Sequence, residues 1–292
     1  MIFMRLGWAI FITFFVLGTL LWGIFWAAAL LLGAAGTGLI YASFLFVGVM
    51  VLIQWAIGPF IVKRMSGAKE CTDKKIIAIV YEIADKANIP RPKVYLVNNP
   101  TPNAFAFGRT QKSSNIALHT GLLEKLSESE VKAVIAHEIG HIKHRDMIVM
   151  TLASALPAVL YYIIYFGVIT ASSRDKQGNV NYLGAWIGGM VAQFLAMLLV
   201  LYLSRVREYY ADAYSAEATK KPGELASALA KISYNLAQTK TQSPSAMRSF
   251  YIADDITSKY SSQMENEKGN AWREIFMTHP LTFKRIRALG KL

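Results

Sequence analysis

The sequence His137-Glu138-Ile139-Gly140-His141 is the most informative stretch of this chain. On an α-helix, residues four positions apart stack on the same face, so both imidazoles can reach one cation. The carboxylate of Glu138 would then point toward the open coordination position of that cation. This arrangement is typical of a hydrolytic zinc site.

The residues around the motif predict that it lies on a helix. Ser127 followed by Glu130 is a capping-box signature for a helix start. Apolar residues then recur at helical spacing, at Val131, Val134, Ile135, Ile139 and Ile142. The alternative is a pair of surface histidines on an ordinary helix. Because the chain has only five His among 292 residues, a chance match is a weak explanation.

Long uncharged runs indicate a membrane protein. The chain is 54% hydrophobic and 17% charged, which is too apolar for an ordinary soluble protein. No charged residue occurs from Leu6 to Val62, whereas one membrane crossing needs about 20 residues. A small-residue turn at 33–38 divides this run into expected helices at 8–32 and 39–62. A cleaved signal peptide is the alternative, but the run is too long and a second span follows at once.

Two later uncharged runs, Met147 to Ser173 and Gly178 to Ser204, bring the expected number of spans to four. Pro157 should kink the third span without excluding it. The fourth contains three glycines that permit close helix packing, namely Gly184, Gly188 and Gly189. Either later run alone would also fit a buried helix of a soluble core.

Positively charged residues predict the orientation in the membrane. They gather at the same side of the expected spans, at Arg5, Lys63, Arg64, Lys69, Lys143, Arg145, Arg205 and Arg207. The two opposite loops carry only Arg174 and Lys176. We therefore expect a multi-pass protein of the cell membrane whose polar parts face the cytoplasm. The net charge of +12 fits a position beside anionic lipid, and no motif for nucleic-acid binding is present.

The spans divide the sequence into four regions. We expect an N-terminal transmembrane hairpin at 1–62 and a second hairpin at 147–204. The polar regions 63–146 and 205–292 lie on the same side and can form one domain. Cys71 is the only cysteine, which rules out an intrachain disulfide and fits a reducing compartment.

The polar regions predict a mixture of helix and strand. Residues 72–88 have the pattern of an amphipathic helix, and short strands are expected at 93–97, 104–107 and 115–118. The fold class is therefore mainly α with a small β-sheet. Residues 238–272 are rich in polar residues and look like a mobile segment, which would be either a lid or a solvated linker.

Two histidines leave a catalytic zinc site one protein ligand short. His144 is the nearest candidate, but it lies about 10 Å along a continuous helix from His137. Glu208 is the better candidate, because it follows the fourth span where the chain returns to the side of the motif. Asp212 lies one turn further on the same helix face and could orient a ligating imidazole. Taken alone, Glu208 could equally be a charge at the end of a membrane helix.

Several motifs in order resemble one family. They are Asn103-Ala104-Phe105-Ala106, then HEIGH, then the E-x-x-A-D pattern of Glu208, Ala211 and Asp212, and finally His279-Pro280 followed by Arg285. In type and order they are similar to the HtpX membrane metalloproteases, relatives of the CAAX prenyl endopeptidases. The resemblance covers nearly the whole chain. The prenyl endopeptidases have a larger membrane portion, which argues against a prenylated-peptide substrate.

The resemblance implies a zincin-like (gluzincin) α+β catalytic domain with one Zn²⁺ per chain. By this resemblance His137, His141 and Glu208 would bind the zinc, and Glu138 would be the general base. A zinc endopeptidase with protein substrates is the function that it implies.

The resemblance also suggests how substrate would bind. Asn103, Ala104, Phe105 and Ala106 would receive the substrate backbone, while His279 and Arg285 would flank the open side of the site and help to hold the oxyanion. Ordinary structural roles also fit these residues: Asn103 after Pro102 suits a turn, and His279-Pro280 suits a helix start.

The expected function is cleavage of cytoplasmic segments of membrane proteins, with misfolded or damaged ones as substrates, in quality control and stress response. The lipid bilayer is the other expected partner, and nucleic acid is not one. A membrane-bound scaffold or holdase without proteolytic activity is the alternative, and it would tolerate loss of Glu138. A transporter would need ionisable groups inside the spans, which offer none.

Overall fold

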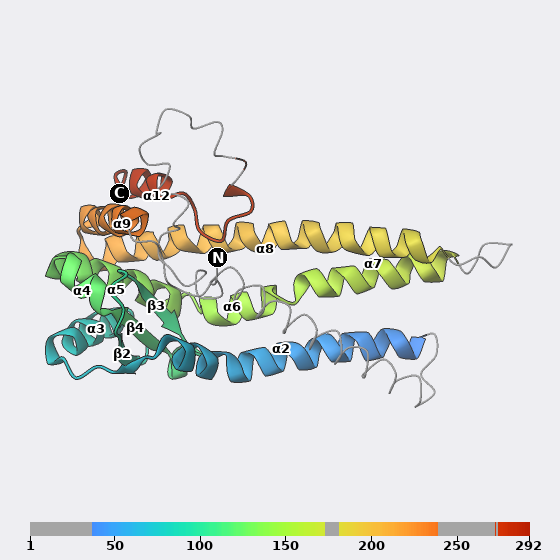
Figure 1. Ribbon diagram of the computed structural model, residues 1–292, viewed down its shortest axis with the longest axis horizontal. Helices are drawn as coiled ribbons and strands as arrows, with labels where there is room; N and C mark the ends of the chain where they lie inside the picture. Colours follow the sequence, from blue (N-terminus) through green and yellow to red (C-terminus); the bar gives the residue numbers. More distant parts are fainter. Residues whose placement is uncertain (1–36, 173–180, 239–271, 273) are drawn as a thin grey trace. The chain divides into compact units, whose positions relative to one another are not determined.

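The computed structural model describes residues 37–172, 181–238, 272 and 274–292 (Figure 1). The chain divides into two compact units. The apolar unit comprises the described residues within 1–54 and 151–200, and the polar unit comprises those within 55–150, 201–243 and 247–292.

Three helical segments in the described part of the chain are long and apolar enough to cross a membrane. They are α2 (Thr37–Ser66), then α6 (Asp146–Ala153) with α7 (Leu156–Ser172), and α8 (Tyr182–Thr219). They correspond to the second, third and fourth expected spans. The first, at 8–32, lies outside the described residues, as does nearly all of the segment 238–272.

Two sequence features of the later spans have clear structural effects. The kink expected at Pro157 is a break between α6 and α7, and Pro157 lies in the first turn of α7, where its missing N–H costs no hydrogen bond within the helix. Gly189 of α8 lies against Tyr161 of α7, and a Cβ at Gly189 would come within 2.8 Å of the tyrosine ring. The absence of a side chain therefore permits the close approach of these helices.

A small mixed sheet forms one layer of the polar unit. Its strands are β1 (Lys69–Glu70), β2 (Lys93–Val97), β3 (Ala104–Phe107) and β4 (Asn115–His119). The strand order is β1-β2-β4-β3; β2 and β4 are parallel and the other pairs antiparallel. The three strands expected from the sequence are confirmed, whereas the two-residue β1 has too short a pattern to be recognised. Among the described residues, β3 is an edge strand.

The helices of the polar unit follow local signals. The amphipathic helix expected at 72–88 is present as α3 (Lys74–Lys86), and the side chain of Asp73 caps its N-terminus. The other elements are the 3₁₀ helix η1 (Gln111–Ser113), α4 (Thr120–Lys125), α5 (Glu128–Lys143), α9 (Pro222–Gln238) and α12 (Thr282–Leu289).

The two faces of the sheet have different side chains. Ala104 and Ala106 of β3 belong with the main core, which also contains the apolar residues of α3, α5 and α9. Phe105 and Phe107 point the other way and pack with Tyr95. Because the β3 side chains on the core face are small, α5 packs closely against this strand.

Candidate metal centre

Helix α5 is fixed at its N-terminus before it reaches the motif. Glu130 Oε2 accepts a hydrogen bond from Ser127 N at 2.8 Å, and Glu130 N donates to Ser127 Oγ at 3.3 Å, which is the expected capping box. Glu130 also accepts hydrogen bonds from Ser227 and Lys231 of α9. These contacts oppose the cost of its burial and lower the pKa of Glu130 to about 2.

Helix α8 brings the third candidate ligand to the motif. A Cβ added to Gly140 would lie 3.0 Å from Ala211 Cα, so the backbones of α5 and α8 are nearly in contact there. Ser215 Oγ donates a hydrogen bond to Ala133 O at 2.7 Å, and Ala133 lies on α5 seven residues before Gly140. The two helices therefore approach closely on the face that carries Glu208.

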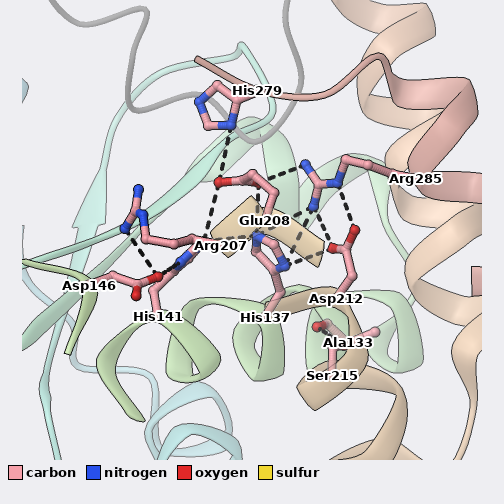
Figure 2. A network of polar contacts seen from close by, with 10 residues as sticks. All are labelled: Ala133, His137, His141, Asp146, Arg207, Glu208, Asp212, Ser215, His279 and Arg285. Atoms are coloured by element: carbon pink, nitrogen blue, oxygen red, sulfur yellow. Dashed lines mark hydrogen bonds and ion pairs between the residues drawn. The ribbon is translucent and has the colours of Figure 1, made fainter. Parts of the chain in front are cut away.

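Three side chains converge on one point between these helices (Figure 2). The Nε2 atoms of His137 and His141 lie 3.2 Å apart. Glu208 Oε2 lies 3.6 Å from the first, and Oε1 lies 3.5 Å from the second. One ligand atom from each residue lies within 4.8 Å of the others, so the group could hold a metal ion.

A carboxylate lies behind each imidazole. Asp212 Oδ1 is 3.0 Å from His137 Nδ1, and Asp146 Oδ2 is 2.6 Å from His141 Nδ1. Since each contact uses Nδ1, each ring turns Nε2 toward the shared point. Asp212 thus contacts His137, and the orienting role expected from the sequence stays a prediction.

Arg285 extends from α12 to contact Glu208 and Asp212. Its guanidinium contacts Asp212 through two nitrogens, at 2.6 and 2.8 Å, and its NH1 lies 3.0 Å from Glu208 Oε2. Burial lowers the pKa of Arg285, but Asp212 and Glu208 outweigh this effect and raise it. The residue is 1% exposed and does not line the cavity at the site. This position differs from the open side suggested by the resemblance.

The charge of the site fits a cation. Burial lowers the pKa of His137, but Asp212 and Glu208 outweigh it and raise the pKa to about 9. Glu208 Oε2 is buried, and its charged contacts are Arg285 NH1 at 3.0 Å and His137 Nε2 at 3.6 Å. Two nitrogen donors and one carboxylate match what a zinc ion requires of its protein ligands.

A cavity of about 280 Å³ opens beside the three candidate ligands. Glu138 and His279 both line it, and His279 Nδ1 lies 3.2 Å from Glu208 Oε1. The segment before His279 is held to α8 by Arg205, which donates to Met277 O at 2.8 Å. Glu138, which the resemblance suggests as general base, and His279, which it suggests near the oxyanion, thus line one cavity with the candidate metal group.

Strand β3 supplies one wall of this cavity, through Phe105 and Ala106. Ala104 and Asn103 are buried, and Asn103 O accepts a hydrogen bond from His119 N at 2.9 Å. Of the four residues predicted to receive substrate, Asn103 immediately precedes β3 and the other three belong to it; Phe105 and Ala106 line the cavity.

Three other residues complete this description. His144 lies at the C-terminus of α5, packs edge-on against the rings of Tyr210 and Tyr214, and is not part of the metal group. Asp146 and Arg207 line the cavity but were not singled out from the sequence as site residues. One signal could have revealed Asp146: an acidic residue bordering a long apolar run needs a partner.

The comparisons with known proteins agree with this geometry. The model of peptidase family M48 matches residues 70–292. A protease HtpX homologue of Moorella thermoacetica is 35% identical over 97% of this chain and 92% of its own length. A second, from Methanothermobacter thermautotrophicus, is 39% identical over 82% of this chain and 92% of its own.

A solved structure shares the fold. The crystal structure of S. mikatae Ste24p aligns with a TM-score of 0.64 over 96% of this chain at 21% identity, and the chain spans 64% of the length of that protein. Together, the helices, the sheet and the site are those of a membrane metalloprotease. The chain belongs to peptidase family M48, among the HtpX-type proteases.

Proposed function

We propose that this protein is a zinc-dependent endopeptidase that cleaves cytoplasmic segments of membrane proteins. The observation that carries the proposal is the convergence of His137, His141 and Glu208 beside Glu138, in a cavity walled by an edge strand. A single zinc ion held by the three ligands would polarise the scissile carbonyl and activate water for attack.

Glu138 would act as the general base. Its position next to the first histidine on α5 places it on the wall of the same cavity. The carboxylate would accept a proton from the attacking water and return it to the leaving nitrogen. Because Glu138 is 3% exposed, bulk water would compete little for this proton.

His279 and Arg285 would have different tasks. His279 lines the cavity, so it can donate a hydrogen bond to the oxyanion that forms from the scissile carbonyl. Arg285 is enclosed by Asp212 and Glu208, so its contribution would be to hold these carboxylates in place. Arg285 would therefore act on the site through Asp212 and Glu208, and would not itself contact the oxyanion as the resemblance suggests.

The substrate would bind as an extended strand beside β3. Among the described residues, one side of this strand pairs with β4 and the other has no neighbouring strand. Main-chain groups at such an edge can pair with a peptide backbone of any sequence. Asn103 to Ala106 would form this docking segment, with Phe105 and Ala106 on the cavity wall.

The membrane arrangement supports a cytoplasmic site. Lys63 and Arg64 occupy the last turn of α2, and Lys143 and Arg145 immediately precede α6. Positive charges next to spans favour the cytoplasmic side. We therefore propose that regions 63–146 and 205–292 form one cytoplasmic catalytic domain at the cell membrane, joined to transmembrane hairpins at 1–62 and 147–204. Damaged or misfolded membrane proteins would be its substrates, in quality control.

The test compares the full chain, purified in detergent under chelation, with Glu138→Gln. Glu128→Gln is the matched control, because this exposed glutamate begins the same helix. Casein cleavage and self-cleavage are followed as zinc is returned. Zinc should restore cleavage in wild type and in the Glu128 variant, but not in the Glu138 variant. Equal behaviour of all three proteins, with no zinc bound, would instead support the scaffold or holdase.

A further inference from the structure

The His141 side of the site has its own carboxylate and guanidinium (Figure 2). His141 Nδ1 and Arg207 NH1 both contact Asp146 Oδ2, at 2.6 and 3.1 Å. The same order of imidazole, carboxylate and guanidinium occurs on the other side, where Asp212 contacts His137 and the buried arginine of α12. Two similar triplets therefore flank the candidate metal group.

The contact with Asp146 determines which nitrogen of His141 is available to a cation. An Nδ1–H that donates to the carboxylate leaves the lone pair on Nε2. That atom faces the candidate metal point, 3.5 Å from Glu208 Oε1. A carboxylate partner of this kind also raises the basicity of a ligating imidazole.

The chain makes a specific turn to place Asp146. Helix α5 ends at Lys143, Arg145 has a left-handed φ of 59°, and α6 begins at Asp146. An acidic residue in the first turn of a helix has an ordinary explanation in the helix dipole. That explanation requires neither burial nor partners, whereas the Asp146 side chain is 6% exposed and contacts two side chains.

Arg207 has hydrogen-bonding capacity that Asp146 does not use. It precedes Glu208 on α8 and lines the cavity. Its guanidinium turns one nitrogen toward Asp146 and another away from it (Figure 2). Its Nε is buried with no hydrogen-bond partner among the described residues. Because a buried unpaired donor is costly, this wall of the cavity is suited to an incoming acceptor.

We propose that Asp146 is a positioning residue for His141, and that Arg207, held by Asp146, donates a hydrogen bond to a main-chain carbonyl oxygen of the substrate. The inference rests on the proposed function, because it takes zinc and a peptide as the ligands of the site. Asp146 thereby connects the metal ligand on α5 with a substrate-binding group on α8.

The role of Asp146 is tested by metal binding rather than by turnover. Metal-free full chain in detergent is titrated with zinc against a chromophoric chelator, and with Co²⁺ while its visible spectrum is recorded. Asp146→Asn should weaken zinc binding about 10- to 100-fold and change the Co²⁺ spectrum. Asp146→Glu, which keeps the carboxylate, should recover part of the affinity. Asp85→Asn is the matched control, because it removes an exposed aspartate that pairs with Arg91.

These titrations separate positioning from general stability. The unfolding midpoint of each metal-free variant is measured alongside. Wild-type zinc affinity and an unchanged Co²⁺ spectrum in Asp146→Asn would overturn the positioning role. If Asp146→Asn does not fold, the affinity of Asp146→Glu decides: a weaker affinity with a shifted spectrum supports the role, and wild-type values overturn it.

The role of Arg207 is tested by substrate affinity without cleavage. Fluorescein-labelled casein is bound to zinc-loaded Glu138→Gln, with and without Arg207→Gln, and the dissociation constants are compared. Loss of the guanidinium should weaken binding about tenfold, as for a hydrogen bond from a charged donor. Arg91→Gln on the same background should have no effect. Unchanged casein affinity, or a loss fully explained by lost zinc, would overturn this role.

Failure of the proposed function would give a different result from failure of the roles of Asp146 and Arg207. It would appear as absence of zinc-dependent casein cleavage by the wild-type protein, whereas the titrations and binding measurements do not depend on turnover.

Discussion

Gly140 of α5 lies directly against Ala211 of α8 at the level of the candidate metal ligands. A Cβ at Gly140 would be 3.0 Å from Ala211 Cα and 3.3 Å from Ala211 O, both backbone atoms. Gly140 precedes His141, and Ala211 lies three residues after Glu208. The distance between these backbones therefore sets how closely the ligands of the two helices can approach each other.

Gly140→Ala should accordingly damage the site more than the fold. The added methyl would push the helices apart by a few tenths of an ångström, and overpacking of this kind costs roughly 1–3 kcal/mol. We expect weaker zinc binding and about tenfold or greater loss of casein cleavage, since misplaced catalytic groups are costly. The measurements are chelator competition and initial rates. Gly223→Ala, with open space around the added methyl, should resemble wild type; equal effects of the two would refute the argument.

The pH dependence of stability should reveal Glu130. Its pKa in the folded protein is about 2, below the ordinary value of 4.5. A lowered carboxyl pKa stabilises the fold fully above pH 4.5, and this contribution is lost as the pH falls toward 2. At pH 7, Glu130→Gln should be less stable than wild type by about 1–3 kcal/mol, and the gap should narrow below pH 4.5.

Chemical unfolding in detergent at several pH values measures this gap. Glu128→Gln, an exposed neighbour in the first turn of the same helix, should differ from wild type by only a few tenths of a kcal/mol. A stability gap for Glu130→Gln that stays constant from pH 7 to pH 2.5 would show that the charge of Glu130 is not responsible.

Arg285→Met should make the metal-free protein depend on zinc for stability. The change removes the guanidinium between Asp212 and Glu208 and leaves two buried carboxylates without their positive partner. We expect this to lower the free energy of unfolding by roughly 3–5 kcal/mol. Saturating zinc should recover part of this loss by mass action. Thermal unfolding with and without zinc tests it, with Arg287→Gln on the exposed face of the same helix as the control. Equal stability of both variants without metal would contradict the role assigned to Arg285.

Gly189→Ala should loosen the packing of α7 and α8. The added Cβ would lie 2.8 Å from two atoms of the Tyr161 ring and 3.3 Å from the Tyr161 carbonyl oxygen. We expect a loss of roughly 1–3 kcal/mol in detergent, measured by thermal unfolding. Gly167→Ala adds a methyl to α7 in open space and serves as the control. If neither change lowers the unfolding midpoint, the close approach of α7 and α8 contributes nothing to stability.

Local patterns predicted the elements that carry the motif. The capping box at Ser127 and the apolar spacing after it located α5, and short apolar runs located β2, β3 and β4. The return of the chain after the fourth span made Glu208 a candidate third ligand, because two helices joined in a hairpin end on the same side, and the family resemblance was needed to prefer it over an ordinary charge at a helix end. Apart from that preference, these inferences need only periodicity and chain direction.

Contacts that depend on side-chain direction could not be predicted in the same way. Asp146 faces His141 because Arg145 adopts a left-handed conformation, which no pattern of apolar residues indicates. The burial of Arg285 depends on how α12 packs against α9, and this is a tertiary relationship. The sequence indicated Glu208 and Asp212 as site residues but not their contacts with Arg285, and it indicated neither Asp146 as a site residue nor its contact with Arg207.

Among the described residues β3 is an edge strand, and this has a consequence for what the enzyme would recognise. Hydrogen bonds along a strand read the main chain, which is the same in every protein, so they discriminate by conformation rather than by sequence. In a segment already folded into a helix or an internal strand, the main-chain donors and acceptors are already hydrogen-bonded, so the segment cannot pair with β3. The selected property would be loss of structure itself, and abundant intact neighbours in the membrane would be spared without any inhibitor.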